Sequence, residues 1–243
     1  QPLIAADSDG RPPAGMTAPG HRFAIASLTF ACLLGLAFGW QLLAMPGGLA
    51  VPAGLSFIPG NLFGGAELPG STLLVPPPAT LVTYQFLHAG WFHILGNLVF
   101  LWIYGPRVEG TLGSGPWTVL LLTCGVVAAL AQAWPDPSSA LPMVGASGGI
   151  SGLLGAYLFL HPRDELHGPG MQLPAWLVLI SWFGLQLLYS NWSEDLPGAV
   201  AFRAHVGGFA CGLLLAPVLH FLALLSADAR PVARTLRSRD SSH

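Results

Sequence analysis

The chain has 243 residues, of which 53% are hydrophobic and only 8% are charged, and its formal net charge is −2. Globular proteins carry about 25% charged residues, so this composition excludes an ordinary water-soluble domain and indicates an integral membrane protein. Basic stretches interleaved with aromatic residues are absent, so the sequence gives no indication of nucleic-acid binding.

Six apolar segments are candidate membrane helices, near residues 23–45, 87–104, 117–134, 147–160, 173–190 and 199–225. The first segment is longer than the hydrophobic region of a signal peptide and is followed by no convincing small-x-small cleavage motif, so we interpret it as a helix. The predicted fold class is an all-α membrane protein with six transmembrane helices. The predicted helix at 147–160 is short and central.

The composition predicts three parts of the chain, which are two tails and a membrane domain between them. Residues 1–21 are rich in Pro, Gly and small polar residues, which predicts a disordered tail, and residues 22–226 form the predicted membrane domain. Residues 227–243 form a basic tail. The nine basic residues are all Arg, and they lie at the two ends of the chain and after the second and fourth segments, with one further Arg at the start of the sixth. By the positive-inside rule both tails are cytoplasmic, and the location is the inner (plasma) membrane.

With this orientation the second, fourth and sixth segments all begin at the outer face. Their N-terminal ends hold the chain's most unusual polar residues, which are His88, His93, Asn97, Ser147 and His205. A polar side chain within a membrane span is costly and is by default a functional-site hypothesis.

The 147–160 segment is too short to cross a bilayer unaided. Its 14 residues give a helix of about 21 Å, against a hydrocarbon core of about 30 Å. If its inner end lies at the cytoplasmic interface, the 135–146 loop must enter the protein from the outer face. Irregular backbone at that depth is tolerated where it lines a water-filled cavity, so water can reach Ser147.

Two small-residue stripes predict close packing between the 147–160 and 199–225 helices; their members are Ser147, Ser151 and Gly155 on one and His205, Gly208 and Gly212 on the other. Such an approach could bring Ser147 Oγ within hydrogen-bond reach of His205. Packing alone would explain the glycines, but it does not explain a histidine on the same face.

On the 87–104 segment, His93 and Asn97 are spaced i, i+4 and share a face. An isolated intramembrane Asn is more often an interhelical hydrogen-bonding residue, but its pairing with His93 favours a functional role. Gly90 indicates that His88 precedes the helix proper.

Three motifs resemble those of the rhomboid intramembrane serine proteases, in the family's order: "FLHAGWFHILGNLVFLWIYGPRVEGTLGS" (86–114), "GASGGISGLLGAYL" (145–158) and "AHVGGFACGLLLA" (204–216). The resemblance implies a rhomboid-like bundle with Ser147 as nucleophile and His205 as general base. It also implies His93 and Asn97 as oxyanion partners and His88 as a supporting residue at the mouth of the site.

The resemblance further implies a structural role for Glu109 and Gly113 at the cytoplasmic side. The Trp-Arg pair that many relatives carry in the first outer loop is absent from residues 46–86. A role of that pair in membrane seating is therefore not expected to carry over to this chain.

All eleven acidic residues lie outside the predicted helices, so we infer a Ser-His dyad, with Glu194 or Asp195 of the last loop as an alternative third member. The oxyanion donors expected are the free N–H groups at the start of the 147–160 helix, the Asn97 amide and a His93 N–H. Gly145 and Gly148, together with Gly149, keep Cβ atoms away from this position.

Ser151 lies one turn deeper than Ser147. There its hydroxyl can donate to the carbonyl of residue 147, and its small size suits helix packing. We therefore predict Ser147 as the nucleophile.

The expected substrates are transmembrane segments of other proteins, which enter from the lipid bilayer or the outer surface. The 173–190 helix, with Trp182, Phe183 and Gln186, is a candidate lateral gate, although these side chains are equally compatible with a lipid-facing surface. The prediction includes no cofactor and no metal, and it leaves the oligomeric state open. Cys32, Cys124 and Cys211 lie in apolar runs and are interpreted as small hydrophobic residues.

Two alternatives remain. One is a histidine-based metal site or transporter using His88, His93 and His205, although there is no HExxH motif and no intramembrane carboxylate to support it. The other is a catalytically inactive relative that binds membrane clients. Such a protein would typically lack the serine or the histidine, and both are present here.

Overall fold

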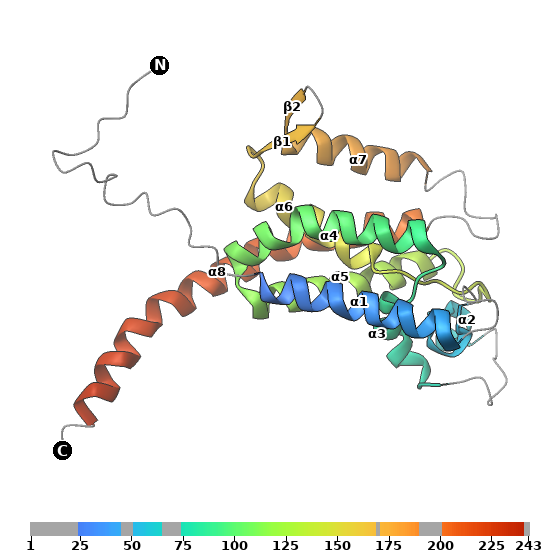
Figure 1. Ribbon diagram of the computed structural model, residues 1–243, viewed down its shortest axis with the longest axis horizontal. Helices are drawn as coiled ribbons and strands as arrows, with labels where there is room; N and C mark the ends of the chain where they lie inside the picture. Colours follow the sequence, from blue (N-terminus) through green and yellow to red (C-terminus); the bar gives the residue numbers. More distant parts are fainter. Residues whose placement is uncertain (1–23, 45–50, 65–73, 169–170, 190–200, 241–243) are drawn as a thin grey trace.

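The computed structural model describes residues 24–44, 51–64, 74–168, 171–189 and 201–240. The disordered tail predicted at 1–21 and the acidic pair at 194–195 lie outside these residues. The described chain is built of helices, with one small β-hairpin (Figure 1).

Six long helices follow the six apolar segments. They are α1 (Ile25–Ala44), α4 (Trp91–Leu112), α5 (Ser114–Ala133), α6 (Ser147–Leu160), α7 (Ala175–Tyr189) and α8 (Phe202–Asp240). The predicted bounds of α6 are those observed. The prediction for α4 was too short, because the helix continues through Pro106. Helix α8 also continues past its apolar part into the tail predicted at 227–243.

Three of these helices are long and apolar enough to cross a membrane, namely α1, α5 and the Phe202–Ser226 part of α8. A fourth span results if residues 77–86 and α4 are taken together, although they are bent by 81° at the break between them. Helices α6 and α7 are apolar but shorter. Large apolar side chains such as Leu43 (91% exposed) and Phe92 (95% exposed) point outward. In a multi-pass membrane protein these positions face lipid.

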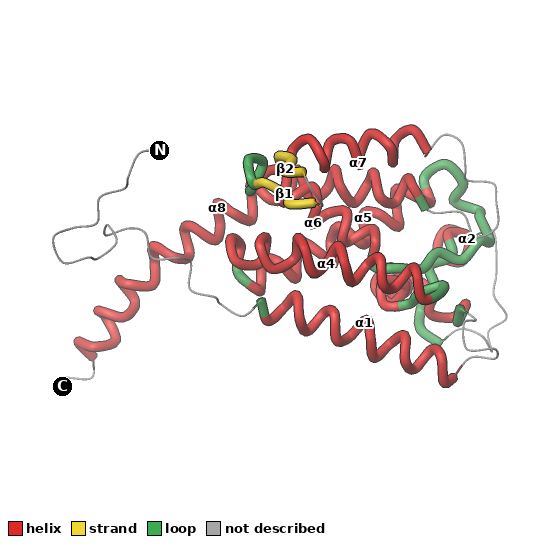
Figure 2. The backbone as a smooth tube through the Cα atoms, turned by 45° about the horizontal axis from the view of Figure 1, so that its top comes forward, coloured by secondary structure: helices red, strands yellow, loops and turns green. Residues whose placement is uncertain are grey.

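Helix α6 is the most enclosed of the long helices. It packs against α8, α5, α4 and α7, and all ten of its residues from Gly148 to Tyr157 are buried. Figures 1 and 2 show α1 and α7 at opposite edges of the bundle, with α4, α5, α6 and α8 between them. The short helix is thus surrounded by protein. A helix too short to cross the bilayer needs such protein contacts around its ends, because backbone groups there cannot be exposed to lipid.

Short elements fill the connection between α1 and α4. They are η1 (Ala53–Leu55), α2 (Pro59–Phe63), η3 (Pro77–Ala79), α3 (Thr80–Thr83) and η4 (Tyr84–Phe86). Phe57 and Tyr84 are fully buried against the end of α5, and the Tyr84 hydroxyl donates to the carbonyl of Gly125 at 2.7 Å. These elements were not predicted, because helices of three to five residues leave no periodic pattern.

The connection between α6 and α7 contains an antiparallel hairpin of β1 (Glu165–Gly168) and β2 (Met171–Pro174), with Glu165 opposite Pro174. The all-α prediction is therefore wrong in this detail. The hairpin was missed because each strand has only four residues and neither alternates clearly between polar and apolar side chains.

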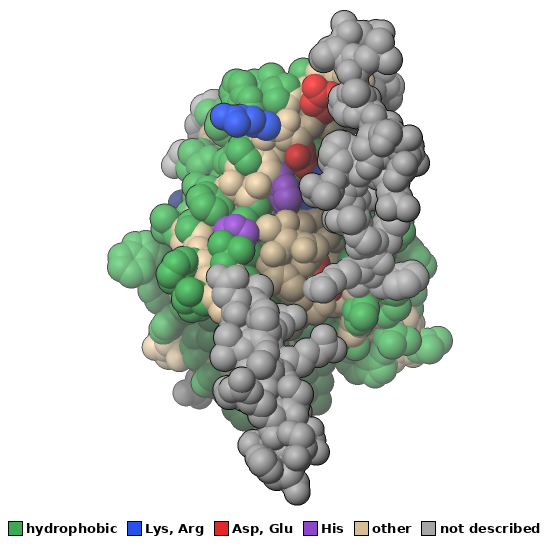
Figure 3. Space-filling view, turned by 90° about the vertical axis from the view of Figure 1, so that its left-hand side faces the viewer, with side chains coloured by type: hydrophobic (Ala, Val, Ile, Leu, Met, Phe, Trp, Pro, Cys, Tyr) green, Lys and Arg blue, Asp and Glu red, His purple; other side chains and the backbone are tan. Residues whose placement is uncertain are grey.

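Charged groups gather at the end of the bundle where α4 and α6 finish. Arg107 Nη1 lies 2.9 Å from Asp164 Oδ2, the Tyr157 hydroxyl donates to the same oxygen at 2.9 Å, and Thr111 Oγ1 lies 2.9 Å from His161 Nε2. Figure 3 views the molecule from this end and shows Arg, acidic and His side chains with hydrophobic side chains around them. This end has the polarity expected of a membrane-water interface.

Glu109 ties the start of α1 to this end of α4 and α5. Its carboxylate accepts hydrogen bonds from the N–H groups of Ala26 and Ser27, and from the hydroxyls of Ser27 and Ser114, at 2.6–2.8 Å. The free N–H groups of a helix N-terminus are stabilised by such an acceptor. Glu109 is 4% exposed, and it lies in α4 rather than outside the helices as predicted. These contacts fit the structural role implied for it.

Candidate active site

Ser147 and His205 are hydrogen-bonded near the N-terminal ends of α6 and α8. Ser147 Oγ lies 2.8 Å from His205 Nε2, although 58 residues separate them in the sequence. Ser147 is partly exposed, whereas His205 is 9% exposed. The predicted approach of these two side chains is confirmed, and the pair has the geometry of a nucleophile next to its general base.

The two helices approach closely because glycines face each other. A Cβ atom at Gly208 would collide with the carbonyl oxygen of Gly148, and one at Gly212 would collide with that of Gly152. A Cβ atom at Gly155, the third member of the predicted stripe, would collide with the carbonyl oxygen of Phe209. The two contacts at Gly148 and Gly152 lie one residue beyond each serine of that stripe. This displacement leaves Ser147 Oγ beside the contact, where it can reach the histidine.

Ser151 makes a different contact. Its hydroxyl donates to the carbonyl oxygen of Ser147 at 2.6 Å, and the residue is 2% exposed. The prediction that the Ser151 hydroxyl donates to the carbonyl of residue 147 within the same helix is confirmed. Its hydroxyl is engaged with the backbone and is enclosed by protein.

The loop before α6 enters the protein. Residues 134–138 are exposed, whereas Gly145 and Ala146 are buried. Met143 exchanges two backbone hydrogen bonds with Phe57, and the Gly145 N–H donates to the Tyr84 carbonyl at 2.9 Å. The inward course predicted for the 135–146 loop is confirmed for residues 143–146. These contacts fix the backbone that leads into Ser147.

His93 faces this loop from the first turn of α4. The N–H of Ala89 donates to His93 Nδ1 at 3.4 Å, so the neutral ring carries its hydrogen on Nε2. A Cβ atom at Gly145 would lie 2.5 Å from His93 Nε2 and 3.7 Å from Ser147 Oγ. Gly145 also has a φ of 119°, a conformation that other residues rarely adopt. Glycine at this position thus leaves space for a polar N–H beside the serine.

Asn97 lies one turn below His93 and is 6% exposed. Its Nδ2 lies 2.9 Å from His88 Nε2, and one amide N–H donates to that nitrogen. The second N–H of the same amino group is then available to another acceptor. His88 therefore fixes the Asn97 side chain and leaves one of its amide N–H groups available as a donor.

His88 stands behind Asn97 and not at the mouth of the site, contrary to what the resemblance implied. It is 0% exposed and precedes α4, as Gly90 indicated. Its backbone is clamped by Gln41 of α1, which donates to the His88 carbonyl at 2.7 Å and accepts from the His88 N–H at 3.2 Å. His88 contacts the site through Asn97 and through the ring of His93, whose centroid lies 5.1 Å from that of His88.

A third polar residue reaches His205 from α7, and the sequence did not identify it in this role. Gln186 Oε1 lies 2.7 Å from His205 Nδ1. Gln186 was noted only as part of a candidate gate. The signal was an uncharged polar side chain in an otherwise apolar helix, which is costly without a partner.

The residues of this site all lie within the region that matches a known protein family. A family model described as the Rhomboid domain matches residues 78–221, more than half of the chain. The chain belongs to the rhomboid family.

Similar curated proteins are rhomboid proteases. The rhomboid protease GlpG of Pectobacterium atrosepticum is 34% identical over 134 residues, which are 55% of this chain and 46% of that protein. The GlpG protein of Klebsiella pneumoniae is 31% identical over 134 residues, with the same two shares. That of Salmonella choleraesuis is 30% identical over 148 residues, which are 61% of this chain and 49% of the relative. The chain therefore spans about half the length of these relatives.

The histidines of this rhomboid chain do not converge as metal ligands would. One nitrogen of His88 is paired with Asn97, one of His93 with Ala89 and both of His205 with other side chains. In the part of the chain that the structure describes, no group of three or more His, Cys, Asp or Glu side chains is arranged to hold a metal ion. These contacts favour the dyad over the metal alternative.

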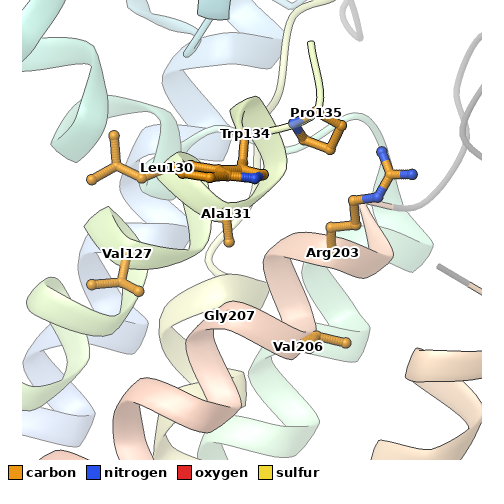
Figure 4. Close-up of a pocket in the computed structure, with 8 residues that line it drawn as sticks. All are labelled: Val127, Leu130, Ala131, Trp134, Pro135, Arg203, Val206 and Gly207. Atoms are coloured by element: carbon orange, nitrogen blue, oxygen red, sulfur yellow. The ribbon is translucent and has the colours of Figure 1, made fainter. Parts of the chain in front are cut away.

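A hollow between α5 and α8 of the rhomboid domain is separate from this site. Figure 4 shows its lining, which comes from α5, α8 and the loop after α5; the residues are Val127, Leu130, Ala131, Trp134, Pro135, Arg203, Val206 and Gly207. The lining contains neither Ser147 nor His205. It is a mostly apolar surface of the kind that faces lipid in a membrane protein.

Proposed function

We propose that this rhomboid chain is an intramembrane serine endopeptidase that hydrolyses peptide bonds in or near transmembrane segments of other proteins. The observation that carries the proposal is the 2.8 Å contact between Ser147 Oγ and His205 Nε2 at the start of a buried helix. The names of the similar rhomboid proteases support it.

The first step transfers the Ser147 hydroxyl proton to His205 Nε2 while the oxygen attacks the carbonyl carbon of the substrate. His205 then gives this proton to the leaving amine, and an acyl-enzyme on Ser147 remains. A water molecule, deprotonated by the same nitrogen, releases the acid and restores the serine. No carboxylate takes part in this scheme.

The oxyanion of the tetrahedral intermediate is stabilised by donors on two sides. The first N–H groups of α6 have no intrahelical acceptor, and the helix dipole favours negative charge at that end. The His93 Nε2–H and the second N–H of Asn97 come from α4. Gly145 leaves the space beside His93 Nε2 and Ser147 Oγ open. The expectation that Gly148 does the same is wrong, because a Cβ atom at Gly148 would instead collide with Ala128 of α5.

The proposed topology has six passes with both tails in the cytoplasm and the site opening to the outer face of the inner membrane. Three helices that are long enough to span and one bent pair that could form a fourth span support it, and the apolar α6 and α7 bring the number to six. Substrate segments would enter from the bilayer.

Active-site labelling tests the proposal. Purified protein in detergent is expected to form a covalent adduct with a fluorophosphonate or an isocoumarin and to cleave members of a panel of tagged transmembrane substrates. Chelators are expected to leave cleavage intact. Loss of cleavage in EDTA with recovery on zinc addition would favour the metal alternative, and binding of clients without labelling or cleavage would favour the inactive relative.

A further inference from the structure

Nδ1 of His205, the ring nitrogen that does not contact Ser147, needs a hydrogen-bond acceptor that the Ser-His dyad does not provide. To accept a proton from Ser147, Nε2 of the neutral imidazole must be free of hydrogen, so the ring hydrogen must sit on Nδ1. An N–H that is removed from water needs an acceptor, because a buried unpaired donor is costly. His205 is only 9% exposed.

Gln186 Oε1 supplies that acceptor at 2.7 Å. An amide oxygen accepts hydrogen bonds and cannot donate them, so this contact selects the Nδ1–H tautomer. The same oxygen continues to accept from Nδ1–H when His205 becomes an imidazolium, and a hydrogen bond from a charged donor is stronger than a neutral one. A side-chain amide can thus perform the orienting part of a triad carboxylate without placing a charge in the membrane.

Trp182 supports the same ring from one turn earlier on α7. Its ring centroid lies 6.0 Å from that of His205, with the planes inclined by 33°. Phe202 lies against the ring from α8, at 6.3 Å and 85°. The imidazole is therefore packed by aromatic rings and tied through Nδ1 to α7.

The fully buried side chains of helix α7 lie in its first half, whereas its second half contacts α8 through half-buried aromatic rings such as Phe183, whose ring stacks on that of Phe209 at a centroid distance of 4.5 Å. Its buried residues are Ala175 and Leu179, both in the first two turns, and Figures 1 and 2 show it at the edge of the bundle. Gln186 lies in the second half, where most neighbouring side chains are exposed. The contact to His205 is a polar link from this part of α7 to the core.

We propose that Gln186 is the positioning residue of His205, a third member of the site that holds the histidine in its basic tautomer and aims Nε2 at Ser147. The inference rests on the proposed serine protease function. If Gln186 holds the ring, the orientation of His205 Nε2 toward Ser147 depends on the position of α7.

Three variants separate this role from simple packing. Gln186→Met keeps the length of the side chain but removes the acceptor, Gln186→Glu keeps an acceptor and adds charge, and Leu185→Met is the control on the exposed side of the same helix (Leu185 is 52% exposed). Each is purified in detergent, and its thermal midpoint, its labelling rate with a fluorophosphonate, and its kcat and KM on one transmembrane substrate are measured.

Gln186→Met is expected to lower kcat and the labelling rate together by about 10–100-fold, with KM within about threefold of the parental value and the thermal midpoint unchanged. Gln186→Glu is expected to retain labelling, with the acidic limb of its kcat/KM profile moved to higher pH, because a carboxylate beside the ring favours the imidazolium. Among the residues that the structure describes, His93 is the titratable group that acts electrostatically on His205, and it is the same in all variants. Leu185→Met should match the parental protein.

Parental labelling and kcat in Gln186→Met, or an unshifted profile in Gln186→Glu, would refute the positioning role while leaving the protease proposal intact. Failure of the parental protein itself to be labelled would instead overturn the proposed function and the inference with it.

Discussion

Ser147 and Ser151 lie one turn apart on α6 but have different surroundings. Ser147 contacts His205 Nε2 and is partly exposed, whereas the Ser151 hydroxyl donates to the backbone and is enclosed. We expect Ser147→Ala to abolish both proteolysis and fluorophosphonate labelling. Ser151→Ala should retain both, with at most a modest loss, because only a local backbone hydrogen bond is removed. Intact-mass spectrometry of the adduct followed by peptide mapping measures this difference.

An adduct mapped to Ser151 would overturn the assignment, and so would a labelled and active Ser147→Ala protein. Circular dichroism and the thermal midpoint of both variants serve as controls for folding.

Asn97 is expected to act as one oxyanion donor among several. Asn97→Ala should lower kcat by about 10–10³-fold, because a single donor is lost while the backbone N–H groups of α6 and the His93 N–H remain. The measurement is kcat on a transmembrane substrate, with Val99→Ala, at an exposed position of the same helix, as the matched control. Cleavage by Asn97→Ala at the parental rate would make Asn97 a packing residue.

At the residue scale the sequence identified the side chains of α4, α6 and α8 that meet at the site. These side chains could be identified because they are polar in apolar segments and lie near the start of three helices. The partner of His205 on α7 was not identified, because helical periodicity says which residues share a face but not which neighbour that face contacts. His88 was placed too far out for a similar reason, since Gln41, which holds its backbone, lies on a different helix 47 residues earlier.

Helices α6 and α8 contact each other through backbone atoms at their glycines. At Gly212 a Cβ atom would overlap the carbonyl of Gly152, whereas a Cβ at Gly35 of α1 would meet no atom within 4 Å. Gly212→Ala is therefore expected to destabilise the fold by about 1–3 kcal/mol through overpacking. Gly35→Ala should be neutral or stabilising by up to about 1 kcal/mol, because alanine favours the helix. The thermal midpoints in one detergent provide the comparison, and equal midpoints would show that α6 and α8 can separate without cost.

At the element scale, the apolar runs predicted where the long helices lie, because hydrophobic length is a strong signal in a membrane protein. The predicted helix bounds were wrong where a helix continues beyond its apolar segment. Helix α4 continues past Pro106 to Leu112, and α8 runs on to Asp240, since a helix needs only satisfied backbone and not an apolar environment. The short helices before α4 and the hairpin after α6 depend on tertiary contacts such as those of Phe57 and Tyr84.

The whole molecule has two unlike ends. One end carries the Glu109 cluster and the Arg107–Asp164 pair, and the other holds the dyad under the loop that leads into α6. The arginine pattern predicts that the charged end is cytoplasmic. A site at the opposite end would then meet substrates and water from the outer face.

Cysteine accessibility tests this orientation. In a background with Cys32, Cys124 and Cys211 replaced by Ala, we introduce Asp136→Cys in the loop before α6 and Arg163→Cys after it, both at exposed positions. A membrane-impermeant maleimide applied to intact spheroplasts should modify only Asp136→Cys, because the bilayer shields the cytoplasmic side, and permeabilisation should expose both. The two positions are separated by the single helix α6, so opposite accessibility also requires that this 14-residue helix carries the chain from one face to the other. Modification of Arg163→Cys in intact spheroplasts would reverse the orientation, and equal modification of both would mean that α6 and its loops return to the same face.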